Sequence, residues 1–285
     1  MRSPITRAPK GIYSPDVKIR SVALVCNPEK SRARVELPRL RAWFKRNGIQ
    51  AQSLRHVKDV DAVVTLGGDG TILSVATQAA LAGVPVLGVN LGRLGFMTSV
   101  ELRVLYPSLQ RWVKGDWAVS ERLMLEVTVP RVKAPLMALN DAVVRIGSTT
   151  RVTAVDAAIQ NEELGRFTGD GVIVATPTGS TAYSLAAQGP VVHPAVEALV
   201  LTPICAHSFT QRPVVFPKHQ TLELRLQDQR VGNEVRLCLD GQRVFVLRSG
   251  DVVRVRCAPY KLKLFQDPKV SYFGVLREKL SWGER

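Results

Sequence analysis

The chain of 285 residues has few of the side chains that build metal or redox centres. The four cysteines lie far apart and form no CxxC pair; they are Cys26, Cys205, Cys238 and Cys257. The four histidines show no HExxH or other ligand spacing. We therefore expect no protein-bound zinc centre, and we expect reduced thiols in the cytoplasm.

Long hydrophobic runs are also absent. No apolar run reaches the roughly 20 residues that cross a bilayer, so we expect no contact with a membrane. Residues 1–18 are basic and proline-rich and lack the apolar stretch of a secretory signal. We expect a flexible basic extension there and a cytoplasmic protein.

Aromatic residues make up 6% of the chain, whose net charge is +15. This positive field attracts nucleotides, polyphosphate or nucleic acid. Because the basic residues are scattered and few aromatic residues lie between them, we expect no nucleic-acid groove. The phosphate-binding signature GxxxxGK(S/T) and the protein-kinase signatures HRD and DFG do not occur.

Strand and helix patterns alternate in the first part of the chain. Apolar runs at residues 22–26, 49–54, 62–66 and 86–89 are typical of buried strands, and residues 37–44, 71–82 and 102–113 have helical spacing. Glycine loops follow the third and fourth runs. This pattern predicts a Rossmann-like open parallel sheet over residues 19–118, with ligands beyond the carboxyl ends of its strands.

From about residue 121 the apolar residues alternate with polar ones, with turn residues between the runs. The pattern predicts a β-sandwich-like all-β domain over residues 119–268, interrupted by one helix near residues 181–188. Residues 272–280 have a helical pattern again. We expect residues 269–285 to return to the first domain.

The sequence GGDGT at residues 67–71 lies between a predicted strand and a predicted helix. Glycines there let the backbone approach a phosphate, and the helix start offers free N–H groups. Gly67, Gly68, Gly70 and Thr71 are therefore candidates for a phosphate loop. Asp69 could accept the proton of a hydroxyl or bind Mg²⁺. Its structural alternative is the N-cap of the helix.

A second motif, DGVIVATPTGSTAYS at residues 170–184, joins an acidic turn, a buried strand and a hydroxyl-rich loop that enters a helix. Such a loop can hold a nucleotide through backbone N–H groups and hydroxyls. Ordinary turn and capping chemistry gives the same composition.

Three further motifs accompany these two: NLGRLGFM at residues 90–97, ALND at residues 138–141 and LDGQ at residues 239–242. The five motifs occur in the order seen in the NAD kinases, which the chain resembles from about residue 20 to 280. The long central motif is specific to them, whereas GGDG also resembles phosphofructokinases and lipid kinases. The resemblance implies transfer of a terminal phosphoryl group from ATP or polyphosphate to the adenosine ribose 2′-hydroxyl of NAD.

The resemblance also implies roles for individual residues. Asp69 would accept the proton of the 2′-hydroxyl with Gly70 in the same contact, and Asp170 would face the nicotinamide end. The remaining residues implied to contact the dinucleotide are Phe96, Asn140, Asp141, Arg151, Thr181, Ala182, Tyr183, Ser184, Ala186 and Gln242.

Several of these residues have a plain structural reading as well. Phe96 and Tyr183 could be core aromatics. Asn140 and Asp141 could form a turn, and the AspGly before Gln242 could form a two-residue hairpin turn.

Two positions depart from the family pattern. Thr168 stands where some bacterial members have a basic residue, and Met97 replaces the more usual leucine.

For phosphoryl transfer we expect Mg²⁺ to bridge the donor phosphates and to lower the cost of charge build-up. The resemblance also implies a homodimer or homotetramer in which a neighbouring subunit completes the dinucleotide site. Two other functions stay open. A lipid kinase of the diacylglycerol or sphingosine type would have no role for the loop at residues 176–183, and a non-catalytic dinucleotide sensor would gain little from a carboxylate beside phosphates.

Overall fold

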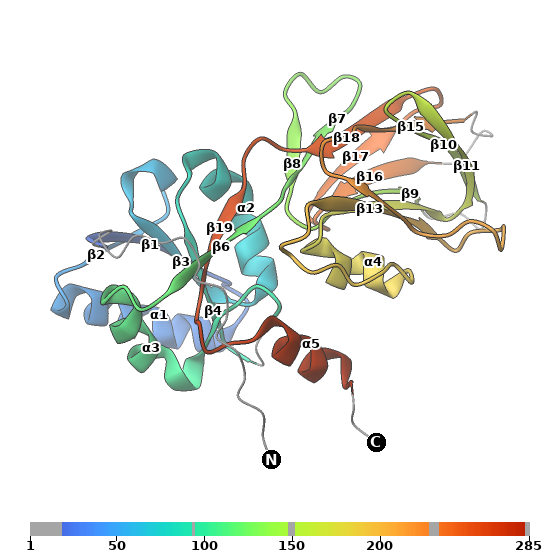
Figure 1. Ribbon diagram of the computed structural model, residues 1–285. Helices are drawn as coiled ribbons and strands as arrows, with labels where there is room; N and C mark the ends of the chain where they lie inside the picture. The colour runs from blue at the N-terminus through green and yellow to red at the C-terminus, as the bar shows by residue number, and fades with distance from the viewer. Residues whose placement is uncertain (1–18, 93–94, 148–151, 228–233, 283–285) are drawn as a thin grey trace, which may run out of the picture. The chain divides into compact units, whose positions relative to one another are not determined.

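The structure is a computed structural model that describes residues 19–92, 95–147, 152–227 and 234–282 (Figure 1). Its contacts divide the chain into two compact units, one running to Glu121 and resuming at Leu262, the other spanning Arg122–Lys261. In the part of the chain described, no helix has the length and apolar character needed to span a membrane.

The first unit is built on one seven-stranded sheet of order β2-β1-β3-β4-β19-β6, with β5 also paired to β4. The pairs β1–β2, β1–β3, β3–β4, β4–β5 and β4–β19 are parallel, as predicted for an open α/β sheet. The strands are β1 (Ser21–Cys26), β2 (Gln50–Ser53), β3 (Ala62–Gly67), β4 (Val86–Asn90), β5 (Val100–Glu101), β6 (Ala118–Arg122) and β19 (Leu262–Gln266).

Helices cover both faces of this sheet. Successive side chains of a strand point to opposite faces, so the apolar side chains of the buried strands need cover on both. Val64 and Leu66 of β3 pack in a core with Phe44 and Trp112. On the other face a Cβ at Gly88 would lie 2.7 Å from Ile72 Cδ1, so glycine lets α2 approach closely. The helices are α1 (Ser31–Arg46), η1 (Val57–Asp59), α2 (Asp69–Ala82), η2 (Leu102–Val104), α3 (Leu105–Val113) and α5 (Tyr272–Leu280).

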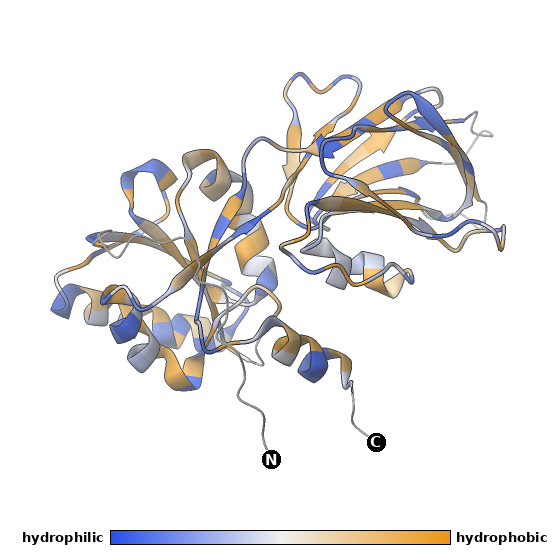
Figure 2. Ribbon diagram, in the orientation of Figure 1, coloured by the Kyte–Doolittle hydropathy of each residue, from blue (hydrophilic) through white to orange (hydrophobic). Residues whose placement is uncertain are grey.

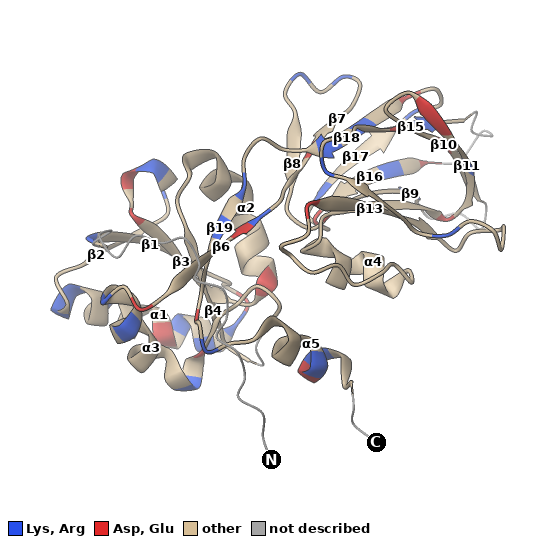
Figure 3. Cartoon of the chain, in the orientation of Figure 1, with Lys and Arg blue, Asp and Glu red and all other residues tan. Residues whose placement is uncertain are grey.

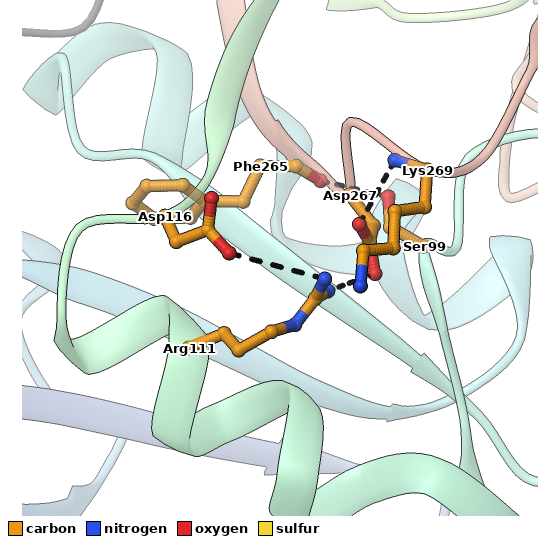
Figure 4. A network of polar contacts seen from close by, with 6 residues as sticks. All are labelled: Ser99, Arg111, Asp116, Phe265, Asp267 and Lys269. Carbon is orange, nitrogen blue, oxygen red and sulfur yellow. Dashed lines mark hydrogen bonds and ion pairs between the residues drawn. The ribbon is translucent and has the colours of Figure 1, made fainter.

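A polar network holds the end of β19 against α3 and the start of β5 (Figure 4). Ser99 Oγ donates a hydrogen bond of 2.8 Å to the Phe265 carbonyl, and Arg111 pairs with Asp267. Asp267 Oδ1 also accepts the Lys269 N–H at 3.0 Å. The network fixes the segment that follows residue 98.

The second unit is a sandwich of two six-stranded sheets, ordered β11-β10-β15-β18-β7-β8 and β14-β13-β12-β9-β16-β17. Every strand pair recorded in it is antiparallel. One core lies between the sheets and includes Val127, Val172, Leu224 and Leu237. In Figure 2 the strands of this unit carry many of its hydrophobic residues, coloured orange. The predicted β-sandwich-like domain is therefore confirmed.

The elements of this unit follow the alternating runs of the sequence closely. They are β7 (Leu125–Thr128), β8 (Leu136–Ala138), β9 (Asp141–Ile146), β10 (Thr153–Ile159), β11 (Glu162–Gly169), β12 (Gly171–Ala175), η3 (Gly179–Thr181), α4 (Tyr183–Ala186), β13 (Ala198–Ile204), β14 (Val214–Pro217), β15 (Leu222–Leu226), β16 (Val235–Leu239), β17 (Arg243–Leu247) and β18 (Val252–Cys257).

The unit boundaries differ from those expected from the sequence. The run at residues 262–266 was assigned to the second domain, but β19 pairs with β4 in parallel and belongs to the first sheet. The largely alternating pattern of LKLFQ fits a strand in either sheet, so only the long-range pairing decides its place.

Candidate active site

The two glycine loops of the first unit begin side by side at the carboxyl edge of the parallel sheet. Gly67 at the end of β3 pairs with Asn90 at the end of β4, and the Leu91 N–H donates to the Gly67 carbonyl at 3.1 Å. This is the edge at which open α/β sheets bind ligands. The predicted placement of both loops at strand ends therefore agrees with the structure.

Asp69 begins α2 but does not cap it. The N-cap is Gly68, whose N–H donates to Thr71 Oγ1 at 3.4 Å, and a Cβ at Gly67 would overlap the Thr71 side chain. The carboxylate of Asp69 instead turns to the following loop, where it accepts the N–H groups of residues 96, 97 and 98 at 2.9, 3.2 and 3.2 Å. The N-cap reading of Asp69 is therefore wrong.

Gly95 makes this arrangement possible. A Cβ on Gly95 would overlap the Asp69 carboxylate and lie 2.7 Å from its Cγ. The Gly95 N–H also donates to Thr98 Oγ1 at 2.8 Å, and Asn90 Nδ2 donates to the same oxygen at 3.1 Å. The loop is thus a preformed cradle that orients one carboxylate.

Phe96 lies in the same cradle. Its side chain is half-buried, and it lines a small cavity with Thr98, Tyr272 and Val275, between the loop and α5. It is therefore not a core aromatic. Gly70, the other residue assigned to this contact, is exposed at the first turn of α2.

In the second unit the loop before α4 rests on the segment that begins β9. Thr176 Oγ1 donates to the Leu139 carbonyl at 2.6 Å, and the Thr176 N–H donates to the Asn140 carbonyl at 2.9 Å. A Cβ at Gly179 would lie 2.7 Å from Asn140 Cα. Asn140 Oδ1 is buried without a hydrogen-bond partner among the described residues, so it is available to a ligand.

Two carboxylates lie beside Asn140, of which Asp141 is buried and Asp240 half-buried. Asp240 accepts the N–H groups of Leu139, Asn140 and Asp141 at 2.8, 2.7 and 3.3 Å. Burial, together with the negative charge of Asp240, raises the pKa of Asp141 to about 7, and burial also raises the pKa of Asp240. The pair therefore retains a proton close to neutral pH.

Stability of the second unit should therefore depend on pH through Asp141. Because the folded pKa lies above the unfolded one, the stabilisation is complete below about pH 4 and is lost as pH rises to about 7. We expect Asp141→Asn to reduce this loss by up to about 1 kcal/mol per pH unit. Urea unfolding between pH 5 and pH 8 measures it, with exposed Glu162→Gln as the control. Equal slopes for all three proteins would contradict the assignment.

The residues around α4 divide into exposed and buried ones. Tyr183 is 38% exposed, so the reading of it as a core anchor is wrong. Thr181 and Ala182 are half-buried, and Ala186 is exposed. Ser184 is fully buried, and its hydroxyl lies 2.9 Å from Thr202 Oγ1, so that side chain serves packing here.

Asp170 lies at the other end of the same strands. Asn140 lies next to the pair Asp141–Ala175, whereas Asp170 precedes the pair Gly171–Arg145. Four residues of strand separate the two ends by about 13 Å. Asp170 is exposed, and its contact raises the pKa of the Cys205 thiol through a hydrogen bond. Asp170 and Asn140 therefore cannot contact the same end of a ligand within one chain.

The LDGQ motif does form the hairpin turn between β16 and β17. Asp240 and Gly241 have φ values of 51° and 66°, and the Gln242 N–H donates to the Leu239 carbonyl at 2.9 Å. Because Leu239 pairs with Arg243, the connection has three residues instead of the expected two. Gln242 follows as an exposed residue. Arg151, which the resemblance also implies as a dinucleotide contact, lies outside the described residues.

Comparison with known proteins now decides the family. Residues 28–117 match the ATP-NAD kinase N-terminal domain, and residues 139–266 match the ATP-NAD kinase C-terminal domain. The chain belongs to the NAD kinase family. An NAD kinase of Geotalea daltonii is 45% identical over 231 residues, which are 80% of this chain and 81% of that protein.

Two solved structures share the fold of this NAD kinase family member at 24% sequence identity. Yeast NADH kinase complexed with NADH has a TM-score of 0.84 and covers 95% of this chain and 89% of its own. An NAD kinase from Archaeoglobus fulgidus in complex with ATP has a TM-score of 0.75, with coverages of 92% and 98%. The resemblance seen in the motifs and the predicted fold class are confirmed.

Proposed function

We propose that this protein transfers the terminal phosphoryl group of ATP to the 2′-hydroxyl of the adenosine ribose of NAD, which yields NADP and ADP. A bond forms between O2′ and the terminal phosphorus while the bond from that phosphorus to its bridging oxygen breaks. The hydroxyl proton leaves to an acceptor. Membership of the NAD kinase family supports the reaction class, and the cradle around Asp69 supports the assignment of the acceptor.

The observation that carries this proposal is the way Asp69 is held. Its carboxylate has about four acceptor positions, and three of them receive the N–H groups of residues 96–98. Oδ1 accepts two of these bonds and Oδ2 one, which leaves one acceptor position on Oδ2. A fixed carboxylate oxygen with one open position can orient a hydroxyl for in-line attack and receive its proton late.

The acceptor NAD would lie on the second unit. Asn140 offers its buried side-chain oxygen Oδ1, which has no hydrogen-bond partner within the described part of the chain. The Asp141–Asp240 pair offers both a donor and acceptors near neutral pH. We assign to these residues, and to the exposed surface of the segment from Thr181 to Ala186, the adenine and ribose contacts of the substrate. Asp170 and Gln242 are assigned to other parts of the dinucleotide.

A divalent cation would be held mainly by the donor. Within the described ranges no group of three or more His, Cys, Asp or Glu side chains could hold a metal ion. Mg²⁺ commonly binds one or two carboxylates together with substrate phosphates, so the phosphate chain itself would supply most ligands. When bound, the ion neutralises charge on the transferred group.

ATP is the proposed donor, with polyphosphate as the alternative, because the solved Archaeoglobus fulgidus relative is a complex with ATP.

We also propose a cytoplasmic homodimer or homotetramer. The terminal strand β17 of its sheet exposes Val244 and Val246 at 54% and 56%, and two adjacent exposed valines on a terminal strand suit burial against a second copy.

The test is direct. Purified protein with NAD, ATP and Mg²⁺ is expected to form NADP, followed by an NADP-specific dehydrogenase coupled to absorbance. ADP release, measured with NAD omitted or replaced by a diacylglycerol or sphingosine, separates this function from that of a lipid kinase. NAD binding without any NADP formed would instead identify a dinucleotide sensor and would overturn the proposal.

A further inference from the structure

Two cations of the first unit lie at the carboxyl edge of the sheet, where the two glycine loops begin. Lys30, which precedes α1, donates from Nζ to the Gly67 carbonyl at 3.2 Å. Arg32, in the first turn of α1, donates from Nη1 to the Leu91 carbonyl at 3.2 Å. A backbone hydrogen bond joins Gly67 to Leu91. Both cations therefore contact the start of the two glycine loops, one of which leads into Asp69.

The position of these charges is unfavourable without an anion. The N-terminal end of a helix carries a partial positive charge and is stabilised by acidic side chains. The first turn of α1 contains no acidic residue, and basic segments recur along α1 in Figure 3. Neither Lys30 nor Arg32 has an ion pair with a carboxylate among the described residues.

A hollow adjoins Arg32 at the same edge. Its volume is about 300 Å³, and it is lined by Arg32, Leu91, Gly92, Glu101, Leu102 and Arg103. Glu101 is paired with Arg103 at 2.6 Å, so the acid in the hollow is already neutralised by its neighbour. A volume of this size is at the lower end of small-molecule pockets.

We propose that Lys30 and Arg32 bind the phosphate chain of the phosphoryl donor, and that the hollow beside Arg32 receives the group at the far end of that chain. Lys30 acts as a point charge beside the GGDG loop, and Arg32 offers its planar fork to phosphate oxygens. This inference rests on the proposed function. It adds the donor site, for which no sequence signature was found.

Binding of inorganic tripolyphosphate and of MgATP to the full chain, measured calorimetrically without NAD, tests the proposal. Lys30→Gln and Arg32→Gln are each expected to weaken binding of both probes about tenfold, since a charge-assisted hydrogen bond is lost. In turnover the KM for ATP should rise about tenfold and the KM for NAD should stay within about twofold. Lys30→Arg should retain most of the affinity.

Arg34→Gln is the matched control. Arg34 lies in the same first turn and donates to the Pro28 carbonyl at 2.9 Å, so its loss removes an equal charge but no contact with the glycine loops. The proposal is overturned if wild-type protein binds neither probe, or if the Lys30 and Arg32 variants lose no more affinity than Arg34→Gln. If Lys30→Gln fails to fold, Arg32→Gln and Lys30→Arg decide the question.

The two proposals fail separately. Tripolyphosphate binding that depends on Lys30 and Arg32, in a protein that makes no NADP, would leave the donor site standing and remove the kinase assignment. Normal ATP kinetics in both variants of a protein that does make NADP would remove only the donor site. ATP bound more tightly than tripolyphosphate would support a nucleoside in the hollow, and equal affinities would overturn that part of the proposal.

Discussion

Replacing Asp69 with Asn is expected to lower kcat about 10²- to 10⁴-fold, the range for loss of a positioned proton acceptor. The amide nitrogen would stand where Oδ2 accepts the Phe96 N–H at 2.9 Å, so the variant loses both the acceptor of the hydroxyl proton and one bond of the cradle. The affinity for NAD should change little, because the proposed adenine contacts lie on the second unit. Steady-state rates with NAD and ATP, together with the Kd for NAD, measure both effects.

Asp61→Asn controls for the loss of an anchoring carboxylate. Asp61 Oδ2 accepts the N–H groups of Arg20 and Ser21 at 2.8 Å each, but it precedes β3 at the opposite edge of the sheet. Both variants lose backbone contacts, and only Asp69→Asn should lose turnover. Near-normal turnover in Asp69→Asn would remove the chemical role given to that residue.

Gly95→Ala is expected to lower kcat about 10²-fold while the Kd for NAD stays close to that of the wild type. The new methyl group would overlap the Asp69 carboxylate, so the carboxylate must turn away from the position that the three N–H groups give it. Displacement by about 1 Å is enough for a loss of this size in an oriented reaction.

Gly274→Ala, in α5, is the matched control. A Cβ there would lie 3.5 Å from Ser271 Cβ, an ordinary contact. We expect that variant to turn over normally. If the two alanine variants have equal rates, the cradle does not position Asp69.

Local patterns in the sequence were sufficient for most of the fold. Apolar runs with glycine at their ends predicted β3, β4 and the loops that follow them, because buried parallel strands and their turns are encoded by neighbouring residues. The alternation from residue 121 predicted the sandwich for the same reason. The assignment of β19 was wrong because its partner β4 is far away in the sequence.

The candidate site was predictable as motifs but not as contacts. The GGDG and LDGQ motifs led to Asp69 and Gln242, yet the residues that hold the site in place were missed. Gly95 acts on a carboxylate 26 positions earlier in the chain, and Asp240 accepts the Leu139 N–H from 101 positions away. The residues of such pairs meet only in the folded chain, and no fixed spacing in the sequence marks them. Lys30 was missed because a lysine near a helix start is common on protein surfaces.

The late pairing of β19 has a consequence for synthesis on the ribosome. The second unit is one continuous stretch, Arg122–Lys261, and can complete its sandwich as soon as that stretch has emerged. The first unit cannot, because β19 lies between β4 and β6 in its sheet and is translated almost last. Until then the nascent sheet keeps an open edge beside β4, exposed to other chains.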